Sequence, residues 1–89
     1  MKVYLVEFSE KFEDENGMLK EYLSWIEKVF DSFEKAEKYC LENGKLVEDA
    51  IFENTYQMHD KKKIETIMHD DELEPDHIFD LTIIEKELE

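Results

Sequence analysis

Apolar and polar residues alternate along two runs at the start of the chain, and this pattern predicts one long β-hairpin over residues 2–30. Asn16-Gly17, a pair typical of tight two-residue turns, lies midway between the runs. Each strand would be about a dozen residues long, well beyond the usual length of roughly five or six. We therefore expect a β-bulge or a frayed tip near residues 13–17.

The predicted turn sets the register of the whole ribbon. If Glu15 lies opposite Met18, the opposed pairs include Phe8 with Trp25, Tyr4 with Val29, and Glu13 with Lys20. One face then carries the core side chains, which are Tyr4, Val6, Phe8, Phe12, Leu19, Leu23, Trp25 and Val29. The opposite face is polar near the turn and apolar at its open end, where the apolar patch consists of Val3, Leu5, Ile26 and Phe30.

Residues 31–44 predict an amphipathic helix, because apolar side chains recur there at helical spacing. Asp31 and Glu34 form a capping-box pattern at its start, and Asn43-Gly44 can adopt the left-handed conformation that ends a helix. The apolar arc consists of Phe33, Ala36, Cys40 and Leu41. We expect this helix to cover a sheet, with Cys40 as a small core residue rather than a reactive thiol.

The second half of the chain gives weaker patterns. Alternation favours a strand from about residue 50 to Met58, followed by a turn over residues 60–63. Residues 64–68 fit either a returning strand or one helical turn. Residues 69–77 predict an acidic loop broken by Pro75, and alternation from Phe79 onward predicts a closing strand with Ile84 on its outer face.

These elements predict a single α+β domain over residues 1–89, since no linker or internal repeat divides the chain. The expected architecture is an antiparallel sheet of four to five strands. Its order along the chain is ββα followed by two or three strands, with one main helix packed on one face.

Charge narrows the range of partners. The chain has 25 acidic and 11 basic residues, all of them lysine, and a formal net charge of −14. Direct nucleic-acid binding is disfavoured, because this charge repels the phosphates that supply most of the affinity, and a membrane surface is disfavoured for the same reason. We expect a basic protein, metal cations or no partner at all. A single cysteine and an acid at Glu7, before any signal-peptide core, predict a cytoplasmic location.

No catalytic or cofactor motif emerges. The only glycines, Gly17 and Gly44, are assigned to the turn and the helix end, so no phosphate-binding loop is available. No serine or cysteine has the context of a nucleophile. We therefore predict no enzyme activity and no cofactor. The three histidines, His59, His69 and His77, each adjoin an aspartate, but their spacing matches no established metal-ligand pattern, and whether they converge is left open.

The segments 2–6 and 29–36 carry a resemblance. A first strand, a second strand ending in an aromatic residue and then a capped acidic helix resemble small uncharacterised proteins of low-GC Gram-positive bacteria and their phages. The resemblance covers the first half of the chain and carries over no functional residue. It implies a phage or mobile-element origin, where small acidic proteins often act by binding another protein.

Two functions follow as hypotheses. The acidic runs can be solvated surface, or they can mimic a phosphate backbone and occupy the basic groove of a nucleic-acid-binding protein, which they would thereby inhibit. The carboxylates concerned are Glu10, Glu13, Asp14, Glu15, Asp70, Asp71, Glu72, Glu74 and Asp76. The alternative is a structural domain that forms a homodimer through the apolar patch, with its acidity serving solubility only. That patch can also be buried within the chain.

Overall fold

A computed structural model describes residues 1–48 and 53–88 of the chain. The elements, in chain order, are β1 (Lys2–Glu13), β2 (Leu19–Phe30), α1 (Phe33–Asn43), β3 (Lys45–Leu46), β4 (Thr55–Met58), α2 (Lys61–Met68) and β5 (Ile78–Glu87). The strands form one antiparallel sheet in the order β2-β1-β5-β4-β3. The predicted α+β fold is confirmed.

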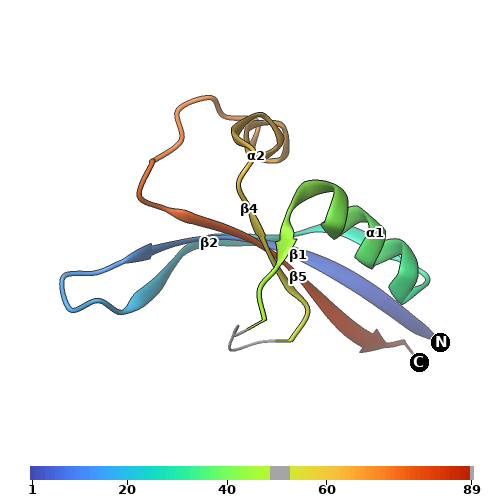
Figure 1. Ribbon diagram of the computed structural model, residues 1–89. Coiled ribbons are helices and arrows are strands. Elements are labelled where there is room, and N and C mark those ends of the chain that lie inside the picture. Colours follow the sequence, from blue (N-terminus) through green and yellow to red (C-terminus); the bar gives the residue numbers. More distant parts are fainter. Residues whose placement is uncertain (49–52, 89) are drawn as a thin grey trace.

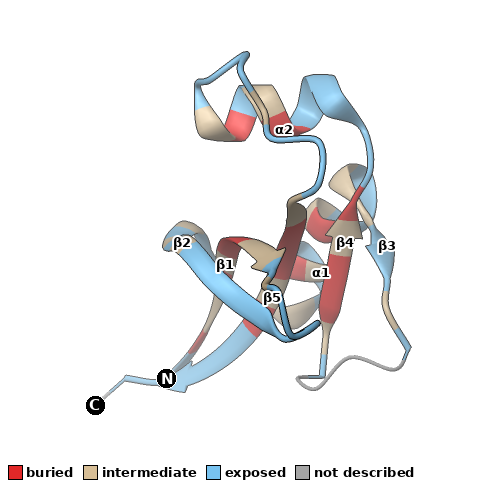
Figure 2. Ribbon diagram, turned by 90° about the vertical axis from the view of Figure 1, so that its left-hand side faces the viewer, coloured by how far each residue is buried: buried red, intermediate tan, exposed pale blue. Residues whose placement is uncertain are grey.

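Both helices cover the same face of the sheet, while the β1-β2 hairpin projects beyond them (Figure 1). The core lies between this face and the helices, and it contains Phe8, Val6 and Leu81 from the sheet with Cys40 from α1 and Ile64 from α2. Buried positions concentrate on β1, β4 and β5, whereas the edge strand β2 has no fully buried residue (Figure 2). The face away from the helices is called the outer face below.

The hairpin turn has three residues in its loop rather than two. The Asp14 amide donates to the Met18 carbonyl at 2.9 Å, so Asp14 lies opposite Met18 where Glu15 was predicted. The Asp14 carboxylate also accepts from the amides of Asn16 and Met18. Gly17 has a φ of 77°, which is the left-handed conformation that a three-residue hairpin loop requires at this position. The Asp14 side chain thus selects the longer loop.

Two bulges in β2 then change the register. Tyr22 and Glu27 are each left without an opposed residue, at the shifts between Glu10 and Lys11 and between Val6 and Glu7. The predicted pair Phe8–Trp25 is confirmed. The predicted pairs of Tyr4 with Val29 and of Glu13 with Lys20 are wrong, because Tyr4 pairs with Phe30 and Glu13 with Leu19.

The bulge at Glu27 exchanges the faces of the residues that follow it. Phe30 turns toward the helices, where its ring lies 5.8 Å from that of Tyr39, and it packs against the core. Val29 turns to the outer face and is 58% exposed. The assignment of Phe30 to the apolar patch and of Val29 to the core is therefore wrong. Leu19, also predicted in the core, is exposed at the end of the hairpin.

The helix α1 begins and ends differently from the prediction. Ser32 is the N-cap, since its hydroxyl accepts from the Lys35 amide at 3.3 Å, while Asp31 forms an ion pair with the Lys35 ammonium group. Gly44 is extended rather than left-handed. Glycine is needed there because a Cβ atom would lie 2.7 Å from the Gln57 carbonyl oxygen of β4. The inward positions Ala36 and Cys40 are fully buried, whereas Leu41 of the predicted arc is exposed.

The second half of the chain contains a helix where a turn and strand were favoured. Asp60 caps α2 by accepting from the amides of Lys62 and Lys63, and Ile64 and Ile67 point into the core. β4 begins at Thr55, and the part of the predicted strand over residues 50–52 lies outside the described residues. The closing strand β5 is confirmed. No helix within the described ranges combines the length and apolarity needed to cross a membrane.

Candidate functional site

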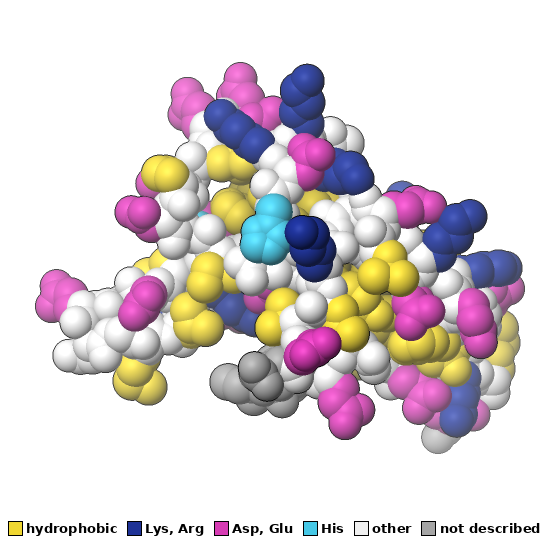
Figure 3. Space-filling model, in the orientation of Figure 1, with side chains coloured by type: hydrophobic (Ala, Val, Ile, Leu, Met, Phe, Trp, Pro, Cys, Tyr) yellow, Lys and Arg dark blue, Asp and Glu magenta, His cyan; other side chains and the backbone are white. Residues whose placement is uncertain are grey.

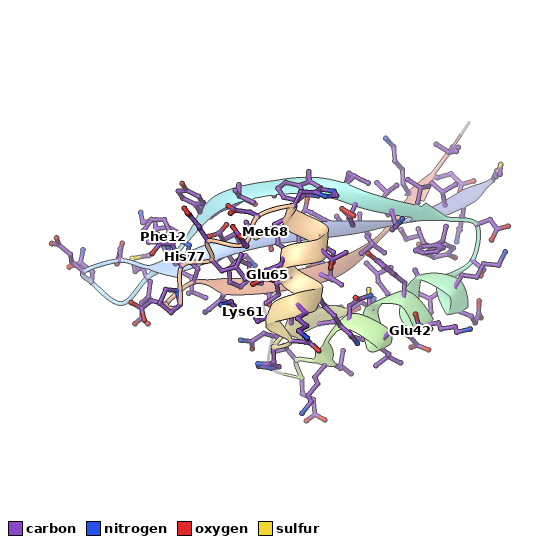
Figure 4. All side chains as sticks on the ribbon, turned by 90° about the horizontal axis from the view of Figure 1, so that it is seen from above. Phe12, Glu42, Lys61, Glu65, Met68 and His77 are labelled. Atoms are coloured by element: carbon purple, nitrogen blue, oxygen red, sulfur yellow. The ribbon has the colours of Figure 1, made fainter. Side chains whose placement is uncertain are left out.

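The turn of the hairpin and the loop before β5 meet at one end of the sheet. In the β1-β5 register Glu10 pairs with Phe79 and Lys11 with Ile78. One further step along both strands brings Phe12 beside His77, and their ring centroids lie 5.7 Å apart (Figure 4). Residues 12–17 and 70–77 are called the acidic end below. The fold thus joins two acidic runs that are far apart in the sequence.

A buried ion-pair partner holds the two segments together. The Nδ1 atom of His77 hydrogen-bonds Oε2 of Glu10, and Glu10 is only 3% exposed. Glu10 points toward the helices because it shares the strand face of Phe8 and Phe12. Its assignment to the exposed acidic surface is therefore corrected: this carboxylate anchors the loop that contains His77.

Three rings surround the His77 contact. The ring centroids of Phe12 and Tyr22 lie 6.5 Å apart, and those of Tyr22 and His77 lie 5.5 Å apart. Tyr22 reaches this cluster from the first bulge of β2, and it is 63% exposed. Met18 and Leu19 are exposed nearby along the hairpin. Apolar surface of this kind beside carboxylates is typical of protein interfaces.

A cleft of about 570 Å³ opens at the acidic end. Its lining consists of Phe12, Glu13, Asp14, Asp76 and His77. The Asp14 carboxylate already caps the turn and lies 3.9 Å from the Lys20 ammonium group. Within the described part of the chain, no residue hydrogen-bonds or pairs with the carboxylates of Glu13 and Asp76. These two groups are free to meet a ligand.

The remaining predicted carboxylates lie around this cleft on exposed backbone. They are Glu15, Asp70, Asp71, Glu72 and Glu74. Only Asp70 has a local role, since its carboxylate accepts from the Glu72 amide at 2.9 Å. Acidic side chains occupy the projecting end of the hairpin and the top of the molecule, where lysines of α2 lie beside them (Figure 3).

The histidines separate into two places. His59 and His77 both line a second cleft of about 400 Å³, which is bounded by α2, β4 and the loop before β5. His69 instead ends α2 in the left-handed conformation. Over residues 1–48 and 53–88, no group of three or more His, Cys, Asp or Glu side chains is placed to hold a metal ion.

A second buried carboxylate, which the sequence analysis did not single out, lies on the outer face. Asp80 of β5 is 3.4 Å from the Lys11 ammonium group. Burial raises the pKa of the Asp80 carboxyl above 3.8, while Lys11 and His59 act in the opposite direction. The pair joins β1 to β5 immediately behind the acidic end, so its role is structural.

The apolar patch has a different membership from the one predicted. Leu5 lies between Val29 and Ile84 in the register, and Ile26 follows opposite Glu7. Ile26 is 45% exposed and Ile84 is 38% exposed, whereas Val3 is buried. The outer apolar patch is therefore Leu5, Ile26, Val29 and Ile84.

Comparison of the chain with protein-family models, curated proteins and solved structures finds no match. The resemblance to phage proteins stays a prediction. The function must therefore be argued from the acidic end and the outer apolar patch themselves.

Proposed function

We propose that this chain is a small non-enzymatic module that binds a basic protein through its acidic end. The observation that carries the proposal is the convergence of two acidic runs, with Glu13 and Asp76 lining one cleft. The buried contact between Glu10 and His77 supports it, because this contact orders the acidic loop against the hairpin. A solvated surface that served only solubility would not need such an anchor.

The composition of the acidic end suits a protein partner. Carboxylates steer a basic surface into contact and speed association, an effect that salt weakens. Exposed Tyr22, Met18 and Leu19 supply apolar contact area next to these charges. Tyrosine in particular often provides much of the binding energy at interfaces. Charge would therefore guide the partner and apolar contacts would hold it.

The specific form of the proposal is an inhibitor of phage or mobile-element type. In the cytoplasm of a host cell it would cover the basic nucleic-acid-binding surface of another protein. A surface that binds phosphate backbones is rich in Lys and Arg, so it is complementary to clustered carboxylates. Such a complex would lose affinity steeply as the salt concentration rises.

The test is a pull-down from lysate at low and high salt with two matched variants. In the first, four exposed carboxylates of the acidic end are neutralised, as Glu15→Gln, Asp71→Asn, Glu72→Gln and Asp76→Asn. In the control, four exposed carboxylates elsewhere are neutralised, as Glu34→Gln, Glu42→Gln, Glu48→Gln and Glu53→Gln. Both variants change the net charge by the same amount.

We expect the wild type and the control to recover the same basic nucleic-acid-handling protein at low salt. The acidic-end variant should recover much less of it, and high salt should release it from all three. Equal loss of recovery by both variants would show that total charge matters and that the acidic end does not. The absence of any basic protein would contradict the proposal.

The outer apolar patch favours a second candidate, a structural domain that forms a homodimer. Val29 and Ile26 are large apolar side chains exposed on one sheet face. Monomers rarely expose larger contiguous patches of this kind. Light scattering should show a dimer if this candidate is correct, and Ile26→Glu or Val29→Glu should give a monomer. A wild-type monomer at high protein concentration would exclude it.

A further inference from the structure

The cleft at the acidic end has two chemically different walls. Rings of Phe12 and His77 form one wall, and the carboxylates of Glu13 and Asp76 form the other. Its volume of about 570 Å³ falls within the range of roughly 300–1,000 Å³ that is typical of ligand pockets. An aromatic wall facing unpaired carboxylates is suited to a flat cation.

The balance of charge around the cleft also favours a cation. Any positive charge on His77 would be offset by Glu10, whose carboxylate bonds its Nδ1 atom. Lys20 lies 3.9 Å from Asp14 and offsets that carboxylate in part. Glu13 and Asp76 have no cationic partner among the described residues. A bound cation would therefore meet two uncompensated negative charges.

Arginine fits these walls better than lysine or a metal ion. Its planar guanidinium group stacks on aromatic rings and forms paired hydrogen bonds with carboxylates. It is also more weakly hydrated than an ammonium group, so leaving water costs less. A metal ion would need a compact set of ligands, and no such set occurs in the described ranges.

We propose that this cleft is the binding site for an arginine side chain of a basic partner protein. The proposal rests on the function proposed above and specifies its contact point. The guanidinium group packs on the Phe12 ring and bonds the carboxylates of Glu13 and Asp76. Tyr22 and Met18 contact the partner's surface around the inserted side chain.

The test uses three capped pentapeptides that differ only at the central residue, Gly-Ser-X-Ser-Gly with X as arginine, lysine or citrulline. Each is titrated into the full-length, isotopically labelled protein at neutral pH and low salt, and the ring and amide resonances are followed by NMR. We expect the arginine peptide to give saturable shifts at Phe12, His77, Glu13 and Asp76. Citrulline has nearly the same shape without the charge, and it should give no saturable shift.

Variants then separate the two walls. Phe12→Leu keeps an apolar side chain but removes the ring, and should weaken arginine binding about two- to fivefold, as expected for an exposed cation–π contact. Asp76→Asn changes only an exposed carboxylate and should reduce the preference for arginine over citrulline. Glu34→Gln on α1 is the matched control and should leave binding unchanged. A nearly unaltered amide spectrum for each variant confirms that the fold is intact.

Equal binding of the arginine and citrulline peptides would overturn the proposal, as would arginine binding no tighter than lysine binding. Shifts centred on another surface would also overturn it. The pull-down distinguishes this failure from failure of the proposed function. If the acidic-end variant still loses the basic protein while the peptides show no arginine preference, the module binds its partner by charge and apolar contact without an arginine site.

Discussion

The two ends of the β1-β2-β5 ribbon are held together by different forces. At the open end, α1 lies over Val6 and buries Ala36 and Cys40, so contacts there are apolar. At the acidic end, the strands extend beyond the helices, and the contact is a polar bond between Glu10 and His77 (Figure 4). Apolar burial is tolerant of direction, whereas a buried carboxylate needs one particular partner.

This difference separates stability from function within one sheet. The open end supplies the larger part of the apolar core and should set the free energy of unfolding. The acidic end contributes less burial but fixes the positions of exposed carboxylates. Substitutions at the two ends should therefore differ in which property they change.

The largest effect is expected at the centre of the sheet. Phe8 is fully buried and packs against Trp25 and Phe79. Phe8→Ala should lower the free energy of unfolding by about 3–5 kcal/mol, through lost burial and a residual cavity. Urea unfolding would measure it, with Phe12→Ala as the matched change at the half-buried acidic end. An equal loss for both would contradict the separation of the two ends.

His77→Ala should come next. It leaves the buried Glu10 carboxylate without its hydrogen-bond partner, which costs roughly 1–3 kcal/mol. Binding to the basic partner should also weaken, because the loop of residues 70–77 loses its anchor. His77→Gln retains a donor group and should recover part of both properties. A fully stable His77→Ala variant would show that the contact is not structural.

Gly44→Ala should destabilise the protein by about 1–3 kcal/mol, as expected for overpacking of a close contact. The added methyl group would lie 2.7 Å from the Gln57 carbonyl oxygen, so α1 and β4 would have to separate. Binding by the acidic end should not change. Thermal unfolding measures the effect, and Leu41→Ala on the exposed side of α1 serves as the control.

The smallest effect concerns Asp80, and it depends on pH. Burial raises the pKa of this carboxyl above its unfolded value of 3.8, although Lys11 opposes the shift. The folded state therefore binds the proton more tightly, and the favourable contribution of protonated Asp80 is lost as pH rises through the raised pKa. The stability of Asp80→Asn relative to the wild type should increase from below pH 3.8 to neutral pH. Asp71→Asn, at an exposed site, should show no such trend.

Much of the architecture could be predicted because alternation and turn residues are local. The pairing of Phe8 with Trp25 and the burial of Ala36 and Cys40 followed from spacing alone. The position of Phe30 could not, since it depends on a bulge at Glu27 that no local pattern marks. The Asp14 side chain similarly lengthened the turn by one residue.

The candidate site depends on a contact between distant segments. The acidic runs were visible in the sequence, but their convergence required the β1-β5 register, which neither run encodes alone. One indication was available: the alternation that turns Phe8 and Phe12 inward also turns Glu10 inward. A buried carboxylate needs a donor, and His77 supplies it.

The most direct test of the convergence is a nuclear Overhauser measurement between the rings of Phe12 and His77. Their centroids lie 5.7 Å apart, so cross-peaks between their ring protons are predicted at neutral pH. The Phe8 and Trp25 rings, 4.8 Å apart, provide the internal positive control. Cross-peaks for the control pair with none between Phe12 and His77 would contradict the account, because the two acidic runs would then not share one end of the molecule.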